Sequence, residues 1–109
     1  MTSLQSAAVE APVNPIIAPV RLTSEHRLEF RRAVLEILEQ AAAVGAEVLE
    51  VDMSACVEMD ASGLGVLVLL RKRARERSMQ TRLLHSPSFV RQMLVVTRLE
   101  TLFEFAPTV

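Results

Sequence analysis

The sequence predicts a single α/β domain with a mostly parallel or mixed sheet of about four strands and helices packed on it. Strand-like and helix-like apolar patterns alternate along the chain, and such alternation favours parallel strands joined by right-handed crossovers. The 109 residues, half of them hydrophobic, suffice for one domain. With no Trp or Tyr and only four Phe, the core must consist mainly of aliphatic side chains.

The N-terminal part of the sequence divides into an arm and a first strand. Residues 1–14 are small and polar without periodicity, so we expect a flexible arm there and a domain at residues 15–109. Residues 16–22 form a strand-like apolar run. Because Pro15 and Pro19 lack the amide hydrogen that a sheet requires, this strand should lie at a sheet edge or be shorter than its apolar content indicates.

The next segment has the pattern of an amphipathic helix. Thr23 or Ser24 can cap its N-terminus, and Gly45 can adopt the left-handed conformation that ends many helices. Charged residues occupy the other faces of this helix. The apolar residues that recur at helical spacing are Phe30, Val34, Ile37, Leu38 and Ala41.

A second strand and a second helix follow. Residues 48–53 alternate, with Leu49, Val51 and Met53 on one face, which predicts a strand. Residues 54–61 are rich in turn formers. A long helix should then begin at Ser62 and run to about residue 77.

The C-terminal part predicts one more strand and one more helix. Residues 81–84 form a short strand. Ser86 followed by Pro87 predicts a capping hydroxyl and a proline in the first helical position. One side of this helix should carry Val90, Met93, Leu94 and Thr97, and a short apolar tail with Leu99, Leu102, Phe103 and Phe105 should close the domain.

The composition excludes several classes of protein. Twelve basic and thirteen acidic residues nearly cancel, which argues against nucleic-acid binding. The longest apolar run, residues 63–70, is far shorter than the roughly 20 residues that span a bilayer. With no secretory signal pattern, we expect a cytoplasmic protein without direct membrane insertion. Cys56 is the only cysteine, and the histidines and carboxylates do not fall at metal-ligand spacings, so we expect no metal or cofactor.

Residues 59–65 join a strand to a helix N-terminus, where α/β sheets commonly place their sites, but they match no enzyme motif. A dinucleotide fingerprint needs a third glycine where Val68 stands, and the nearest lysine for a phosphate-binding loop is Lys72. A nucleophile elbow needs glycines at the positions of Asp60 and Leu64. These mismatches disfavour an enzyme.

A serine nucleophile with a histidine base is the weakest alternative. Ser62 would have to meet His26 or His85, and nothing in the spacing brings either histidine to it. Both histidines are more simply interpreted as surface residues.

The start of the second helix instead predicts a docking surface. The simplest role of Asp60 or Ser62 is a helix cap, worth about 1 kcal/mol. A phosphate on Ser62, however, would meet free backbone donors and the positive end of the helix dipole. At helical spacing one face should point to the sheet and carries Gly63, Leu67, Leu70 and Ala74. The opposite face should lie in water and carries Ser62, Gly65, Leu69 and Lys72.

The run from Val48 to Leu70, with its Asp-Ala-Ser-Gly-Leu-Gly core at residues 60–65, closely resembles the STAS domain family of sulfate transporters and anti-sigma factor antagonists. The likeness extends to a Leu-x-x-Leu-Phe ending at Phe103. Ala61 stands where many antagonists have Ser or Thr, and the family's usual Gly-x-Leu-Asp turn is replaced by residues 21–24, which leaves the pairing of the first strand open.

The resemblance implies that the chain binds an anti-sigma factor that is also a serine kinase. Phosphorylation of Ser62 would end this complex, and a phosphatase would restore it. The partner-binding residues are then expected to be Asp60, Ala61, Ser62, Gly63, Gly65, Leu69 and Lys72. The alternative is a STAS subunit that braces the ATPase of a lipid-trafficking ABC transporter through the same surface.

The basic run at residues 71–77 has two interpretations. A solvated helix end is the simpler one, since cations interact well with the C-terminal end of a helix dipole. Attraction of an acidic partner is the other.

Overall fold

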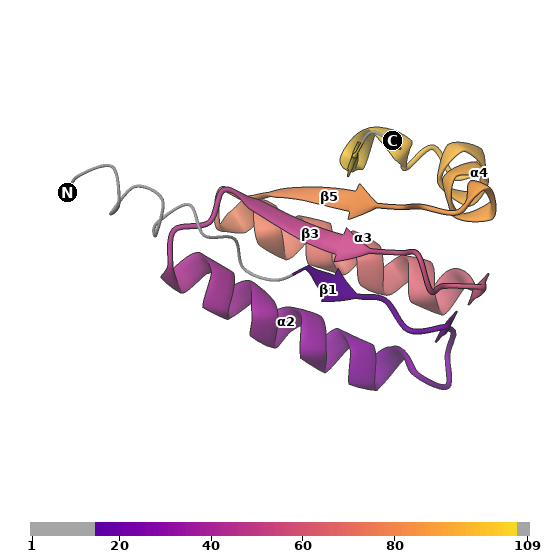
Figure 1. Cartoon of the computed structure of the whole chain (residues 1–109), viewed down its shortest axis with the longest axis horizontal. Coiled ribbons are helices and arrows are strands. Elements are labelled where there is room, and N and C mark those ends of the chain that lie inside the picture. The colour runs from indigo at the N-terminus through magenta and orange to yellow at the C-terminus, as the bar shows by residue number, and fades with distance from the viewer. Residues whose placement is uncertain (1–14, 107–109) are drawn as a thin grey trace.

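A computed structural model describes residues 15–106 of the chain, so the predicted arm at residues 1–14 lies outside the described residues. Strands and helices alternate through the domain (Figure 1). The elements are β1 (Ile16–Ile17), β2 (Arg21–Leu22), α2 (Arg27–Ala43), β3 (Val48–Asp52), β4 (Glu58–Met59), α3 (Ala61–Glu76), β5 (Gln80–Leu84), α4 (Ser88–Val96), a 3-10 turn (Glu100–Leu102) and β6 (Glu104–Phe105).

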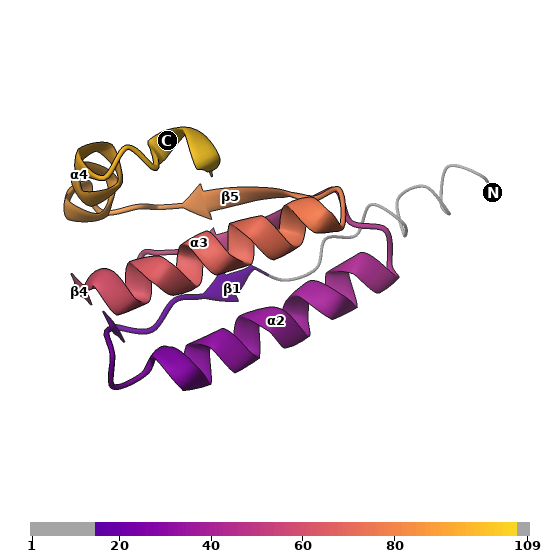
Figure 2. The same cartoon turned by 180° about the vertical axis from the view of Figure 1, so that it is seen from behind.

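The main sheet has four strands in the order β1-β3-β5-β6, and β2 and β4 form a separate pair. All the pairings are parallel. The sheet lies in front of α3 in Figure 1 and behind α3 in Figure 2, which shows the molecule from the opposite side. In both views α2 runs beside α3. The two long helices therefore cover the same face of the sheet. The predicted α/β class and parallel sheet are confirmed.

The first strand is broken at Pro19. Ile16 of β1 pairs with Val51 at the edge of the main sheet, whereas Leu22 of β2 pairs with Met59 of β4. Because proline offers no amide donor, the chain cannot continue the β1 ladder through this residue. The prediction of an edge or shortened strand is confirmed, and the open question of its pairing is resolved as parallel to β3.

Two strands escaped the sequence prediction. β4 lies in the stretch predicted as turns, and β6 lies in the predicted apolar tail. Each has two residues, too few to show an alternating pattern, and each exists because a partner strand offers free backbone groups. The side chain of Arg91 in α4 lies over the ring of Phe105 in β6, 4.6 Å from the ring centre, and helps to hold this last strand in place.

The predicted cap of the first helix is wrong. α2 begins at Arg27, and neither Thr23 nor Ser24 caps it; His26 occupies the N-cap position and makes no side-chain capping bond. The amide of Ser24 donates to a carboxylate across the loop instead. At the other end Gly45 has φ +72°, which confirms the predicted left-handed C-terminus.

The third helix also begins later than predicted. Pro87 occupies its N-cap position, and the hydroxyl of Ser86 caps nothing, having no hydrogen-bond partner among residues 15–106. Val90 and Leu94 are buried as predicted. Thr97 is exposed and its hydroxyl donates to the carbonyl of Met93, so this residue ends the helix rather than packing in the core.

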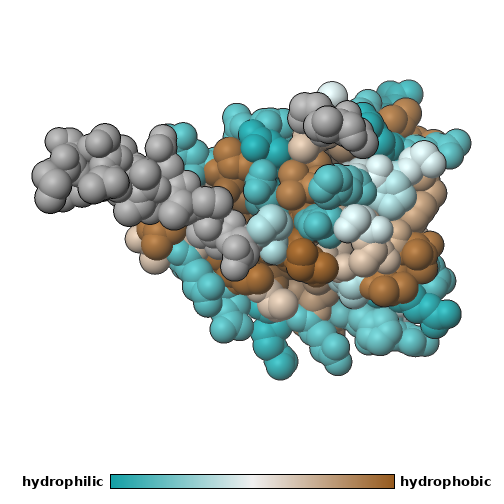
Figure 3. Space-filling view, viewed as in Figure 1, coloured by the Kyte–Doolittle hydropathy of each residue, from teal (hydrophilic) through white to brown (hydrophobic). Residues whose placement is uncertain are grey.

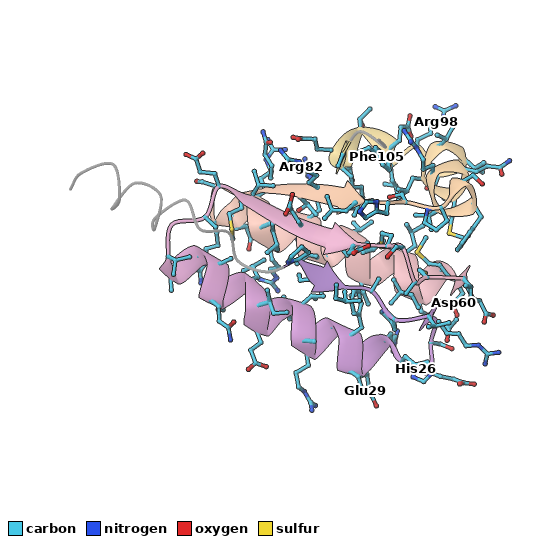
Figure 4. The ribbon with its side chains drawn as sticks, in the orientation of Figure 1. His26, Glu29, Asp60, Arg82, Arg98 and Phe105 are labelled. Atoms are coloured by element: carbon cyan, nitrogen blue, oxygen red, sulfur yellow. The ribbon has the colours of Figure 1, made fainter. Side chains whose placement is uncertain are left out.

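The core lies between the sheet and its two long helices. Leu49, Val51 and Leu83 point from the strands toward the helices and are buried, as the predicted alternation of the second strand requires. On the open face Arg82 of β5, labelled in Figure 4, forms ion pairs with Glu50 of β3 and Glu104 of β6, the two neighbouring strands. Charged and apolar side chains mix on this face (Figure 3).

The burial of α3 leads to a test of the fold. Leu67 is fully buried, so Leu67→Ala should lower the free energy of unfolding by about 2–5 kcal/mol. Leu28, 62% exposed on α2, is the matched control, and Leu28→Ala should change this free energy by less than about 0.5 kcal/mol. Urea titration measures both values. Similar losses in the two variants would contradict the packing described.

Candidate functional site

The candidate site lies where β4 passes into α3, and Asp60 organises it. The Oδ1 atom of Asp60 accepts from the amide of Gly63 at 3.0 Å and caps the helix. Its Oδ2 atom accepts from the amide of Ser24, also at 3.0 Å. Asp60 and His26 lie at the same end of the domain (Figure 4). One carboxylate thus joins the start of α3 to the loop before α2.

These bonds hold the pKa of Asp60 below its ordinary value. The amide of Gly63 contributes most, and the amides of Ser24 and Ser62 add to it. Each amide donates to the ionised carboxylate and so favours the charged form. The negative charge lies at the positive end of the α3 dipole, where it is most stabilising.

Gly63 lets the helix approach β2 at backbone contact. A Cβ atom on Gly63 would lie 2.0 Å from the carbonyl oxygen of Leu22 and 2.7 Å from its Cγ atom. The same carbonyl oxygen accepts a hydrogen bond from the amide of Asp60 at 3.2 Å. Only a glycine fits here, so the close contact between Gly63 and Leu22 fixes the position of the start of α3 against β2.

A groove of about 470 Å³ runs between the first turns of α2 and α3. Its apolar walls include Leu28, Val66 and Leu69, and its polar lining comes from Ser62 and two arginines of α2, Arg27 and Arg31. No carboxylate within residues 15–106 forms an ion pair with either arginine. Arg27 is also the first residue of α2, where the helix dipole disfavours a cation. The groove therefore combines apolar surface with uncompensated positive charge.

Gly65 lines this groove and differs from Gly63. It is exposed, and a Cβ atom at Gly65 would meet nothing within 4 Å. A glycine inside a helix costs about 1 kcal/mol relative to alanine, and no neighbour in the described part of the chain requires it. The missing side chain leaves the groove floor open to another molecule.

The predicted site residues fall in different places along α3. Ala61 and Lys72 are exposed, and Ser62 is half-buried at the groove. Lys72 lies beyond the groove lining, and Gly63 is buried. Leu69 is half-buried, not fully in water as expected, because α2 packs beside it. The structure thus brings Ala61, Ser62, Gly65 and Leu69 together in one groove, and Asp60 caps the helix that carries them.

The contribution of α2 to this groove was missed from the sequence. The helical pattern places Arg31 only among the charged residues on the other faces of this helix, and it predicts no role for Arg27 or Leu28. Leu28 carried a signal, since it is a large apolar residue outside the predicted apolar stripe. Two valines on neighbouring loops, Val20 and Val57, are exposed as well. The amide of Val57 donates a 2.8 Å hydrogen bond to the carbonyl of Val20, which joins these loops.

Other candidate groups do not assemble into a reactive centre in the described chain. No hydrogen bond joins His26 or His85 to Ser62. Cys56 is buried, and its burial raises the pKa of the thiol. Between residues 15 and 106, no three His, Cys, Asp or Glu side chains converge as a metal site would need. None of the helices formed by these residues has the length and apolar character to cross a bilayer.

Comparisons with known proteins agree on the fold. The model of the family described as "Mlab, STAS domain" matches residues 15–104. The crystal structure of a candidate anti-sigma factor antagonist from Thermotoga maritima superposes with a TM-score of 0.72. At 21% sequence identity, the match covers 90% of this chain and 86% of the other. No curated protein matches the chain.

The two glycines of α3 should respond oppositely to alanine. Gly63→Ala should lower the free energy of unfolding by about 1–3 kcal/mol, since the methyl group collides with the backbone of Leu22. Gly65→Ala should raise it by up to about 1 kcal/mol, because its methyl group enters open space and helix propensity improves. Urea titrations measure both. A stabilising Gly63→Ala would refute the backbone contact.

Asp60 should make folding sensitive to acid. Its folded pKa lies below the value of about 3.9 in an unfolded chain, so its stabilisation is complete above roughly pH 5 and is lost as pH falls through the folded pKa. Asp60→Asn should therefore show a flatter fall in stability below pH 5. Thermal unfolding from pH 7 to pH 2 measures this. Asp52, whose pKa is lowered by the amide of Ser54, remains in both proteins, so some acid dependence should persist. Parallel curves would contradict the role of Asp60.

Proposed function

The chain belongs to the STAS domain family, and on this basis we propose that it is a non-enzymatic binding module of the anti-sigma factor antagonist type. Its partner is an anti-sigma factor that is also a serine kinase. The observation that carries the proposal is the open floor of the groove at Gly65, which no contact within the described chain explains. A partner segment packed directly on this helix backbone accounts for the glycine.

The charge of the groove supports an acidic partner segment. Arg27 and Arg31 line it without carboxylates of their own among residues 15–106, and Leu28 adds an exposed apolar side chain. Guanidinium groups pair with carboxylates in a planar two-bond geometry. We expect the partner to insert an apolar side chain flanked by Asp or Glu, and the association rate to fall with salt.

Phosphorylation of Ser62 is the proposed switch. The Oγ atom of Ser62 gives up its proton to a base of the partner kinase and attacks the γ-phosphorus of ATP bound there; the bond to the bridging oxygen breaks, and ADP leaves. The product carries about −1.5 to −2 charges. Because Ser62 lines the same groove as Arg27 and Arg31, the phosphate competes with the partner's carboxylates for these guanidinium groups. A phosphatase reverses the change by hydrolysis.

A second candidate is the STAS subunit that braces a transporter ATPase. The apolar residues exposed at this end of the domain favour it: Val20, Leu28 and Val57 are 54%, 62% and 67% exposed. Permanent interfaces are more apolar than transient ones. In this role Ser62 would contact the ATPase without being modified.

Capture from the native host with the immobilised chain tests the shared surface. Gly65→Gln should reduce recovery of the partner at least tenfold, about 1.4 kcal/mol, because its side chain fills the groove floor. Ala43→Gln, at an exposed position near the end of α2, is the matched control and should retain recovery. Equal recovery with both variants would remove the groove from the proposal.

The identity of the partner and the state of Ser62 then separate the two candidates. For the switch, mass spectrometry should find a kinase and a reversible phosphate on Ser62 that differs between growing and stressed cells. Ser62→Asp should weaken kinase binding at least tenfold, whereas Ser62→Ala should bind and resist phosphorylation. An unmodified Ser62 in a complex with a transporter ATPase would favour the brace and reject the switch.

A further inference from the structure

A second hollow lies near the other end of α3, away from Ser62. It has a volume of about 470 Å³ and is bordered by the last turns of α3, the start of β5 and the segment from the 3-10 turn to β6. This volume falls within the roughly 300–1,000 Å³ of typical small-molecule sites. The proposed docking of a partner at the groove makes no use of it.

Thr81 supplies the first sign of a ligand. This residue of β5 lines the hollow and is only 3% exposed, yet its Oγ1 atom has no hydrogen-bond partner among the described residues. A buried hydroxyl without a partner loses its hydration and gains nothing in return. The other residues of the described chain that are buried to this degree are apolar, so Thr81 places a polar atom in apolar surroundings. A ligand atom that bonds to this hydroxyl accounts for its retention.

The charges around the hollow select an anion. Arg71 and Arg75, one turn apart on α3, both line it, and neither forms an ion pair with a carboxylate in the described chain. Their neighbour Arg73, by contrast, pairs with Glu76. The one acidic residue of the lining, Glu104, pairs at 2.6 Å with Arg82, which also pairs with Glu50. Positive charge therefore predominates here.

The remaining walls select an apolar tail. Met79 and Phe103 are buried in the lining, and Leu102 is half-buried beside them. We propose that this hollow binds a small amphiphilic carboxylate. Its carboxylate accepts hydrogen bonds from the hydroxyl of Thr81 and from the guanidinium groups of Arg71 and Arg75, and its chain packs on Met79, Leu102 and Phe103.

Three probes separate the contributions of charge and tail. Sodium octanoate carries both, octanol carries only the tail, and sodium acetate carries only the charge. In amide NMR titrations of the full chain, octanoate should give saturable shifts at Thr81, Met79 and Phe103. Octanol and acetate should each bind at least tenfold more weakly. Equal binding of octanoate and octanol, shifts centred on Ser62, or shifts that never saturate would overturn the proposal.

Matched variants test the named residues. Thr81→Val preserves the shape of the side chain and removes the hydroxyl, so the folded state should be retained while octanoate affinity falls at least tenfold. Arg75→Gln should also weaken octanoate binding, whereas Arg73→Gln on the same helix should leave it within twofold. If Thr81→Val binds octanoate as tightly as the parent chain, the hydroxyl serves water only and the site is rejected. None of these results depends on the partner proposed for the Ser62 groove.

Discussion

The contact between the carbonyl of Leu22 and the backbone of Gly63 sets the position of every other part of the site. Leu22 is completely buried, and its carbonyl also accepts the amide of Asp60. A side chain at Gly63 would push α3 away from β2, because the two backbones already touch. Asp60 completes the junction by binding the amides of Gly63 and Ser24. The start of α3 is therefore held by main-chain contacts and by the carboxylate of Asp60, and none of these contacts uses the side chain of Ser62.

The groove forms where α2 and α3 lie side by side without filling the space between them. α2 and α3 cover the same face of the sheet, and they contact each other along much of their length. Near their first turns, Gly65 contributes no side chain to fill the space between them. The result is a hollow built on two helices, which suits the docking of a partner proposed for the surface around Ser62.

The charged side chains are unevenly paired, although the composition of the chain is nearly neutral. Arginines at positions 21, 73, 77 and 82 pair with carboxylates, so their charges are largely compensated. Arginines at positions 27, 31, 71 and 75 have no ion-pair partner among residues 15–106, and they line the two hollows at opposite ends of α3. Total charge bears on the class of partner, but local pairing decides where an anion can bind. Only three-dimensional neighbours reveal that pairing.

By itself the sequence determined the alternating α/β order, the buried face of α3 and the segment around Ser62, because helical and strand periodicity are local properties of the chain. It also placed Gly45 at a helix end, since one residue's backbone freedom decides that terminus. Tertiary structure decided the rest. β4 and β6 form only because partner strands pair with them. The amide of Ser24 donates to Asp60, and Ser24 does not cap α2. Gly63 touches the backbone of Leu22, whereas a side chain at Gly65 would meet open space. Each of these outcomes depends on residues distant in sequence, whose approach no local pattern encodes.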